Sequence, residues 1–286
     1  MVNQLLTGKA PYGKPLTGFG IAITRPIDQA KKLSALITEA GGTPILFPLI
    51  EITPLNNYSQ FESVIAEVNQ YDWAIFISSN AVQNGMPRLI KQTAQQGIPA
   101  KLKFAAIGPV TAAELHNFGV KKVLTPLNHV QAGDEKKVRF DSESLLALPE
   151  MQQVNGQKVM IFRGIGGRDV LAQTLKARGA TVTFAECYQR INPQTDCDLL
   201  MQLWNEKKLD GIVVTSSEAM RHLLDLAGDS DWLKNVTLFV NHARIAELPL
   251  QMGLNVCVTD APGDDATLKL LSIQMTSGLA LKNRKH

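Results

Sequence analysis

Short apolar segments alternate along this chain with longer segments in which apolar residues recur every three or four positions. The apolar segments are three to six residues long, and several are rich in Ile, Val and Phe. Such runs are typical of strands that are buried on both faces of a parallel sheet. The predicted strands are 20–24, 44–49, 73–77, 104–107, 158–162, 181–185, 211–214, 238–240 and 255–258.

The segments between these strands have the periodicity of amphipathic helices. In 29–39, for example, Ala30, Leu33 and Ile37 fall on one helical face. Further helices are predicted at 111–118, 169–178, 219–226 and 266–273, and another begins at Ala81. Gly41, Gly119 and Gly179 follow predicted helices, where glycine favours termination. The alternation predicts an α/β fold with parallel sheets covered on both faces.

A repeat with an offset of 138 residues relates the two halves of the chain. The offset relates the pairs Ile23/Ile161, Arg25/Arg163, Leu33/Leu171, Gly41/Gly179, Thr43/Thr181, Asp72/Asp210, Ser78/Ser216, Ser79/Ser217 and Ala81/Ala219. Ordinary composition would not place so many identities in one register. We therefore predict two related α/β domains from an internal duplication.

Composition changes this picture little. The 286 residues carry a net charge of +3, and the Lys and Arg residues are dispersed, which argues against a nucleic-acid binder. The three cysteines form no C-x-x-C pair, so neither a disulfide framework nor a zinc site is expected. We see no signal peptide and no membrane-spanning run, and we expect a cytoplasmic protein with a solvated basic tail.

Candidate site residues follow the strands, because ligands of open parallel α/β sheets bind beyond the carboxyl ends of the strands. The segments concerned are 24–26, 78–80, 108–111, 163–168, 215–217 and 241–244. They supply guanidinium groups, hydroxyls and backbone N–H groups at helix starts, all of which bind anions. Helix capping explains Ser78, Ser79 and Thr111 equally well. Arg25 and Arg163 hold the same place in both halves, and we expect both to face the ligand.

Several familiar nucleotide-binding and catalytic motifs are absent from the sequence. After Gly164 and Gly166, the third glycine of a dinucleotide fingerprint is replaced by Asp169, and no P-loop pattern occurs. Neither a nucleophile elbow nor H-E-x-x-H is present. His116 and His222 fall in helices and are interpreted as structural or surface residues, whereas His242 follows a strand. The pair 264–265 is interpreted as the capped start of a helix rather than a metal site.

Taken together, the motifs resemble one family, the bacterial uroporphyrinogen-III synthases. The motifs are Ile23-Thr24-Arg25-Pro26, Phe47-Pro48-Leu49-Ile50-Glu51, Ala106-Ile107-Gly108-Pro109-Val110-Thr111-Ala112, Ser142-Glu143-Ser144-Leu145-Leu146, Arg163-Gly164-Ile165-Gly166-Gly167-Arg168, Glu186-Cys187-Tyr188-Gln189-Arg190 and Val214-Thr215-Ser216-Ser217-Glu218. Each motif is weak alone, but together they keep the family's order over residues 20–271.

The resemblance implies a HemD-like fold, in which a two-segment extended linker joins two parallel-sheet α/β domains. It implies a discontinuous domain of residues 18–49 plus 192–278 and a continuous domain of residues 52–188. Residues 1–17 would form an N-terminal extension and residues 279–286 a basic tail. The crossovers should fall near 49–52 and 187–191, at equivalent points of the two repeats, and two thin connections imply hinge motion.

The resemblance also implies an activity: cyclising dehydration of hydroxymethylbilane to uroporphyrinogen III, with inversion of ring D through a spiro intermediate. No cofactor or metal would be needed, since the enzyme's main work is to hold the substrate in shape. It implies Tyr188 as a weak acid at the crossover, with a packed linker tyrosine as the equal alternative. The implied substrate-binding residues are Arg25, Ser78, Ser79, Asn80, Gly108, Thr111, Arg163, Gly164, Gly166, Arg168, Thr215, Ser216, Ser217 and His242.

In the second half, Asn241-His242-Ala243-Arg244 stands where some relatives carry threonine, so His242 or Arg244 would replace that contact. We expect a monomer that binds a small-molecule substrate, with transient contact to the preceding pathway enzyme and no membrane or nucleic-acid partner. Three rival hypotheses are a hinged, non-catalytic binding protein for a small anion, a nucleotide-dependent enzyme, and an engineered or divergent, inactive synthase. The failed glycine motifs argue against the second.

Overall fold

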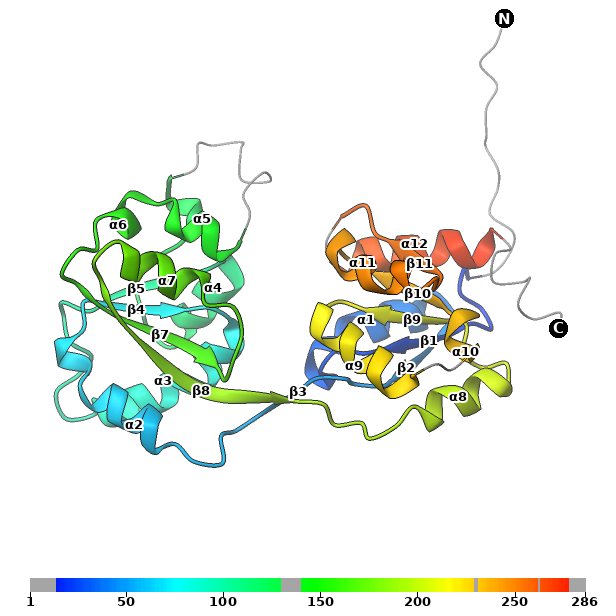
Figure 1. The fold of residues 1–286 in the computed structure, drawn as a ribbon, viewed down its shortest axis with the longest axis horizontal. Helices are drawn as coiled ribbons and strands as arrows, with labels where there is room; N and C mark the ends of the chain where they lie inside the picture. The colour runs from blue at the N-terminus through cyan, green and yellow to red at the C-terminus, as the bar shows by residue number, and fades with distance from the viewer. Residues whose placement is uncertain (1–13, 130–139, 229–230, 262, 278–286) are drawn as a thin grey trace, which may run out of the picture. The chain divides into compact units, whose positions relative to one another are not determined.

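The computed structural model describes residues 14–129, 140–228, 231–261 and 263–277, and the chain in it forms two α/β units (Figure 1). Unit 1 comprises Met1–Glu51 and Ile191–His286, and unit 2 comprises Ile52–Arg190. Residues 1–13 of the predicted extension and the tail 279–286 lie outside the described residues. So do residues 130–139.

Unit 1 is built on a parallel sheet with the strand order β11-β10-β9-β1-β2. Its strands are β1 (Gly20–Ile23), β2 (Thr43–Leu46), β9 (Gly211–Val214), β10 (Thr237–Val240) and β11 (Val256–Val258). The inner strands β1 and β9 are buried along their whole length. Their apolar side chains are therefore covered on both faces, as the sequence predicts.

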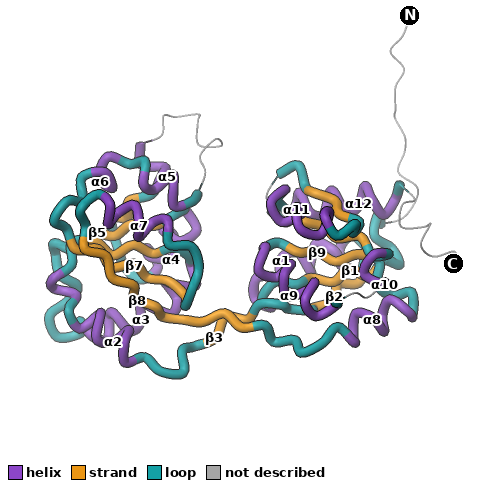
Figure 2. The backbone as a smooth tube through the Cα atoms, in the orientation of Figure 1, coloured by secondary structure: helices purple, strands orange, loops and turns teal. Residues whose placement is uncertain are grey.

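Helices flank this sheet, as Figure 2 shows in purple against orange strands. They are α1 (Ile27–Glu39), α8 (Asp198–Asn205), α9 (Ser217–Ala227), α10 (Asp231–Lys234), α11 (Ala243–Gln251) and α12 (Asp264–Thr276). Leu33 of α1 and Leu271 of α12 share one core with Ile21 and Phe239 of the sheet. Ile212 is also fully buried, and it occupies an alternate strand position. It therefore faces the opposite layer.

Unit 2 contains the second sheet, with the order β3-β8-β7-β4-β5-β6. The strands are β3 (Glu51–Thr53), β4 (Trp73–Phe76), β5 (Lys103–Ala106), β6 (Val123–Leu124), β7 (Lys158–Gly164) and β8 (Thr181–Ile191). The pairs from β8 to β6 are parallel. The confirmed fold class is thus a duplicated parallel-sheet α/β architecture.

Two hydrophobic cores lie on the two faces of this sheet. On one face, Phe76 and Phe162 stack with ring centroids 4.1 Å apart, in the core that contains Met86 and Leu115. On the other, Ile75 packs in the core of the remaining helices. The first layer holds α2 (Ser59–Ala66), η1 (Val68–Gln70), α3 (Ser79–Gln92) and α4 (Pro109–Asn117), and the second holds α5 (Ser142–Leu146), α6 (Pro149–Gln152) and α7 (Val170–Ala177). A 3₁₀ turn, η2 (Pro126–His129), follows β6.

The sequence repeat corresponds to a repeat of strand order in the two sheets. Strands β7, β8, β4, β5 and β6 hold the places in unit 2 that β1, β2, β9, β10 and β11 hold in unit 1. Asp72 Oδ2 accepts a hydrogen bond from the Lys158 backbone N–H at 2.9 Å, and Asp210 Oδ2 accepts one from Gly20 at 2.9 Å. The four residues are two repeat pairs, so the same side chain pins the same pair of strands in each unit.

Most predicted elements exist, with shifted ends. The strand expected at 44–49 ends at Leu46, and the helices expected from 111, 219 and 266 begin two residues earlier at Pro109, Ser217 and Asp264. These helices begin earlier because Gly108, Ser216 and Gly263 already take the N-cap position. The helices α2, α5, α6, α8, α10 and α11 were not predicted. The strand expected at 181–185 continues to Ile191.

The two units change over near the predicted crossovers. The boundary between the two units falls between residues 51 and 52 and between residues 190 and 191. At these points β3 and the end of β8 are neighbours in one sheet. The expected bounds, 18–49 plus 192–278 and 52–188, differ from this division by a few residues and remain a prediction. Extended strand rather than free linker therefore connects the units at both crossings.

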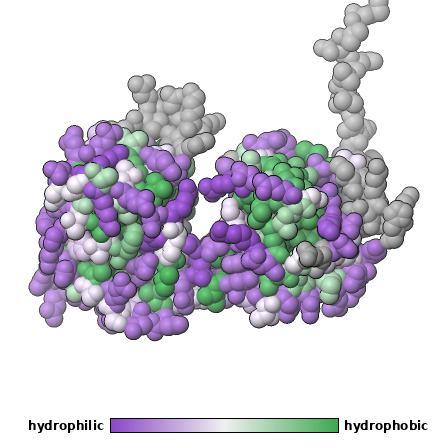
Figure 3. Space-filling model, in the orientation of Figure 1, coloured by the Kyte–Doolittle hydropathy of each residue, from purple (hydrophilic) through white to green (hydrophobic). Residues whose placement is uncertain are grey.

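On the face drawn in Figure 3, polar side chains dominate the outline of each unit, and apolar side chains gather toward its middle. Within the described residues, no helix combines the length and apolar character that a bilayer crossing requires.

Candidate active site

Each sheet has one switch point, where the chain leaves two adjacent strands in opposite directions. In unit 1 it lies between β1, which leads to β2, and β9, which leads to β10. In unit 2 it lies between β7, which leads to β8, and β4, which leads to β5. Ligands of open α/β sheets bind beyond the carboxyl ends of strands at such points. The residues that follow these four strands therefore define the candidate sites.

At the switch point of unit 2, Ser78 caps the N-terminus of α3 and contacts Tyr188. Ser78 Oγ accepts a hydrogen bond from the Ala81 backbone N–H at 3.1 Å. The same oxygen lies 3.3 Å from the hydroxyl oxygen of Tyr188, and either hydroxyl can be the donor. Tyr188 is 2% exposed, whereas Ser78 is half-buried. Ser78 thus connects the buried phenol to the accessible edge of the sheet.

The ring of Tyr188 packs on Gly164 at the end of β7. A Cβ atom at position 164 would lie 2.6 Å from a ring carbon of Tyr188, closer than side chains tolerate. The register of β7 against β8 shifts at this point, so that Arg163 pairs with Glu186 and Gly164 pairs with Tyr188. Only glycine leaves room for the ring here, which fixes where the phenol lies.

Arg163 was expected to face the ligand, but its guanidinium is turned into its own loop. Nη1 lies 2.8 Å from Oδ1 of Asp169, Nε donates to the Gly164 carbonyl at 3.2 Å, and Nη2 donates to the Gly166 carbonyl. The side chain is 4% exposed and lies over the Phe184 ring. In this structure Arg163 holds the glycine turn in place, and its contact with substrate stays a prediction.

The other predicted residues of unit 2 lie on the same edge. Ser79 and Asn80 are half-buried in the first turn of α3, and Gly108 is the N-cap residue of α4. Thr111 is buried, with 7% exposure, in the first turn of that helix. Arg168 is exposed, and its Nη1 lies 3.9 Å from a carboxylate oxygen of Glu143.

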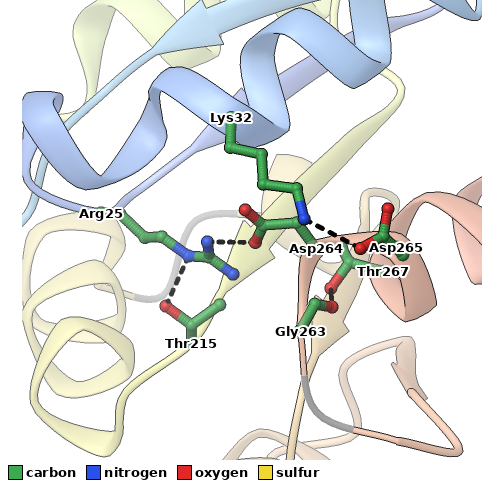
Figure 4. A network of polar contacts seen from close by, with 7 residues as sticks. All are labelled: Arg25, Lys32, Thr215, Gly263, Asp264, Asp265 and Thr267. Atoms are coloured by element: carbon green, nitrogen blue, oxygen red, sulfur yellow. Dashed lines mark hydrogen bonds and ion pairs between the residues drawn. The ribbon is translucent and has the colours of Figure 1, made fainter. Parts of the chain in front are cut away.

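In unit 1, Arg25 spans the switch point (Figure 4). It follows β1, and its Nε donates to Oγ1 of Thr215, which follows β9, at 3.1 Å. Its Nη1 forms an ion pair with Oδ1 of Asp264, in the first turn of α12. The Arg25 side chain is 14% exposed and that of Asp264 12%. Two acceptors from separate elements therefore hold this guanidinium at the edge of the sheet.

Lys32 and Asp265 extend this network to the exposed surface. Lys32 Nζ lies 2.9 Å from Oδ2 of Asp265. The hydrogen bond and charge of the Lys32 ammonium lower the pKa of the Asp265 carboxyl, and Asp265 in turn raises the pKa of Lys32. The start of α12 is thus tied both to Arg25 and to α1 (Figure 4).

Ser216, Ser217 and His242 lie beside this network on the carboxyl edge of unit 1. Ser216 Oγ accepts from the Ala219 N–H at 3.1 Å and caps α9. Ser217 Oγ is buried, and among the described residues it has no hydrogen-bond partner. His242 is exposed and caps α11, with Nδ1 accepting from the Arg244 N–H at 3.1 Å. These positions accord with both capping and ligand contact, so their binding role stays a prediction.

Sequence reasoning missed the role of Asp264. We interpreted the acidic pair as a helix start, and α12 does begin there. The ion pair with Arg25 joins residues 239 positions apart, and no local pattern indicates it. His116 and His222 are confirmed as structural residues, since their Nδ1 atoms bond the carbonyls of Val120 and Leu49. Within the described ranges, no group of three His, Cys, Asp or Glu residues is arranged to hold a metal ion.

With this geometry established, comparison with known proteins gives the family. The family model described as "Uroporphyrinogen-III synthase HemD" matches residues 31–269. This chain belongs to the uroporphyrinogen-III synthase family. The match covers most of both units, including both switch points apart from Arg25 and its strand, and it confirms the resemblance inferred from the motifs.

Two curated relatives match over nearly their whole length. The uroporphyrinogen-III synthase of Escherichia coli K12 is 33% identical over 255 residues, which cover 88% of this chain and 99% of that protein. The Proteus mirabilis synthase is 31% identical over 204 residues, covering 71% of this chain and 96% of that protein. The similarity therefore concerns the whole enzyme rather than one domain.

Solved structures share the fold. A mutant uroporphyrinogen III synthase from Thermus thermophilus aligns with a TM-score of 0.57 at 18% identity, covering 92% of this chain and 99% of that chain. The enzyme from Helicobacter pylori aligns with a TM-score of 0.53 at 16% identity, covering 88% and 97%. At these identities the likeness concerns the fold alone.

Proposed function

We propose that this chain catalyses the cyclising dehydration of hydroxymethylbilane to uroporphyrinogen III, with inversion of ring D. The observation that carries the proposal is the match to 99% of the length of the Escherichia coli synthase. The enzyme is accordingly a cyclising lyase of tetrapyrrole and heme biosynthesis.

The chemistry of the two switch points supports this proposal. The substrate carries several acetate and propionate arms, and each unit offers groups that bind carboxylates. Unit 1 supplies the guanidinium of Arg25, and unit 2 supplies backbone N–H groups at the starts of α3 and α4. Binding at several arms would hold the chain of pyrroles in the shape that forms the spiro intermediate.

Tyr188 and Ser78 are proposed to assist departure of the terminal hydroxyl. Because Tyr188 is buried and Ser78 is not, the proton passes through Ser78. Ser78 gives its hydroxyl proton to the leaving group, which departs as water, and takes the proton of Tyr188. The pyrrole N–H proton that is released as the azafulvene forms restores the tyrosine. The net reaction loses one molecule of water.

The test is to incubate the purified protein with freshly generated hydroxymethylbilane and to separate the oxidised uroporphyrin isomers by chromatography. Dominant type III product, without added metal or nucleotide, is the expected result. Only type I product, formed at the rate of spontaneous closure by folded protein, would reject the activity. A non-catalytic binding protein would then be the better hypothesis.

Monomeric state and cytoplasmic location are further parts of the proposal. The family's small tetrapyrrole substrate requires no macromolecular partner, and transient contact with the enzyme that supplies the substrate stays a prediction. Light scattering at micromolar concentration tests the monomer, and a stable dimer would contradict it.

A further inference from the structure

The guanidinium of Arg25 is fixed on two sides and open on the third. Nε is bonded to Thr215 and Nη1 to Asp264, whereas Nη2 has no partner among the described residues (Figure 4). The side chain remains 14% exposed. An arginine held in this way presents its remaining N–H donors in a single orientation.

The repeat provides an internal comparison. In unit 2 the corresponding arginine, Arg163, uses Nε, Nη1 and Nη2 for bonds within its own loop and is 4% exposed. The two arginines therefore hold the same place in the repeat, but only Arg25 keeps an open nitrogen. A carboxylate ligand can reach Arg25 without breaking any bond that Arg25 makes.

The orientation of Arg25 depends on the first turn of α12. Gly263 begins this turn with a φ of +107°, and Thr267 closes it by donating to the Gly263 carbonyl at 3.0 Å. Acidic residues are favoured in the first turn of a helix by its dipole, which suits an aspartate at position 264. Asp265 anchors the same turn to Lys32 of α1. The turn is thus held independently of Arg25.

We infer that Asp264 is a positioning residue, which holds Arg25 so that Nη2 binds one carboxylate arm of the substrate. The inference rests on the proposed function and extends it to a residue outside the predicted site. Asp264 also excludes an anion from Nη1, because the two carboxylates would repel each other. The arm must therefore approach from the Nη2 side, which fixes its direction relative to unit 1.

Kinetics of type III isomer formation by four proteins test this inference: the wild type, Asp264→Ala, Asp264→Asn and Asp265→Ala. Asp264→Ala removes the acceptor, and we expect KM to rise about tenfold, the effect of one lost charge-assisted hydrogen bond, with a smaller change in kcat. Asp264→Asn keeps an acceptor oxygen and should raise KM less. Asp265→Ala removes the neighbouring ion pair, which does not touch Arg25, and should raise KM far less than Asp264→Ala does.

A double-mutant cycle with Arg25→Met separates positioning from a general structural role. If Asp264 acts through Arg25, Asp264→Ala has no further effect on KM once Arg25 is replaced. An equal rise in KM in both backgrounds, or equal effects of Asp264→Ala and Asp265→Ala, would overturn the inference. If Asp264→Ala does not fold, the same cycle is run with Asp264→Asn, and an unchanged KM in that variant overturns it. Wild-type protein that forms only type I isomer instead refutes the proposed function.

Discussion

The hydroxyl oxygen of Tyr188 lies 3.3 Å from Oγ of Ser78, so a strand residue of β8 reaches the capping residue of α3 across the switch point of unit 2. Because Ser78 Oγ already accepts from the Ala81 N–H, its own proton is available for donation. The pair therefore has the arrangement of a short proton path from a buried phenol to the edge of the sheet.

Tyr188→Phe removes the acid and keeps the ring that packs on Gly164. We expect kcat to fall about 10²-fold, the lower end of the contribution of a general acid. The free energy of unfolding should fall by only about 1 kcal/mol, the net value of one hydrogen bond. Steady-state assay at saturating substrate and urea denaturation measure the two quantities. Full wild-type turnover would refute an acid role for Tyr188.

Ser78 allows the proton path to be tested apart from the phenol. Ser78→Gly removes the hydroxyl while costing only a few tenths of a kcal/mol as an N-cap, and Ser78→Thr restores a hydroxyl. We expect kcat to fall in the glycine variant and to recover in the threonine variant. Equal kcat values for all three proteins would exclude Ser78 from proton transfer.

Gly164→Ala should displace the ring of Tyr188. The added Cβ would lie 2.6 Å from that ring, and overpacking of this kind costs roughly 1–3 kcal/mol. We expect a lower free energy of unfolding and reduced kcat. In a Tyr188→Ala background the clash partner is absent, so the same substitution should cost little. If Gly164→Ala lowers the free energy of unfolding equally with and without the Tyr188 ring, the clash with that ring is not the cause of the loss.

The architecture could be predicted from the sequence because its signals are local. Four-residue strands such as Gly211–Val214 are apolar throughout, and the 138-residue repeat marks the duplication. Helices such as α2 and α8 were missed. Both are only eight residues long and lack a strong start signal, since Tyr58 and Cys197 stand at their N-cap positions and provide no side-chain cap.

The candidate site was predictable by position but not by orientation. Repeat symmetry placed Arg25 and Arg163 at equivalent strand ends, and the structure keeps them there. What each guanidinium binds depends on its surroundings: Asp169 lies six residues beyond Arg163, whereas Asp264 reaches Arg25 from the far end of the chain. Such long-range pairs leave no periodic signal in a single sequence.

Replacement of the two repeat arginines should therefore have different consequences. Arg163→Met leaves two backbone carbonyls without their donor, and we expect a loss of roughly 1–3 kcal/mol in the free energy of unfolding. The KM of the Arg163→Met variant, measured at a temperature where the variant is folded, should differ little from that of the wild type. Arg25→Met should raise KM clearly more than Arg163→Met does. Equal KM values in the two variants would contradict the divergence of the two arginines.

Cys187 offers a prediction for alkaline pH. Its thiol is fully buried beside the carbonyl oxygens of Ala81 and Arg163, and burial raises its pKa from about 9 to about 12. The folded state therefore keeps its proton where the unfolded state loses it. The stability that this provides is complete below pH 9 and is lost progressively as the pH rises toward 12.

We expect the free energy of unfolding to fall more steeply between pH 9 and pH 12 in the wild type than in Cys187→Ala, which has no thiol to ionise. Denaturant titrations at fixed pH values measure both slopes. Other groups also titrate in this range, but they are common to both proteins, so the difference between slopes isolates Cys187. Cys257→Ala is the matched control, because its half-buried thiol is less desolvated and its removal should change the slope less. Identical slopes for the wild type and Cys187→Ala would mean that the buried thiol ionises as readily as an exposed one, and would contradict the effect of burial on its pKa.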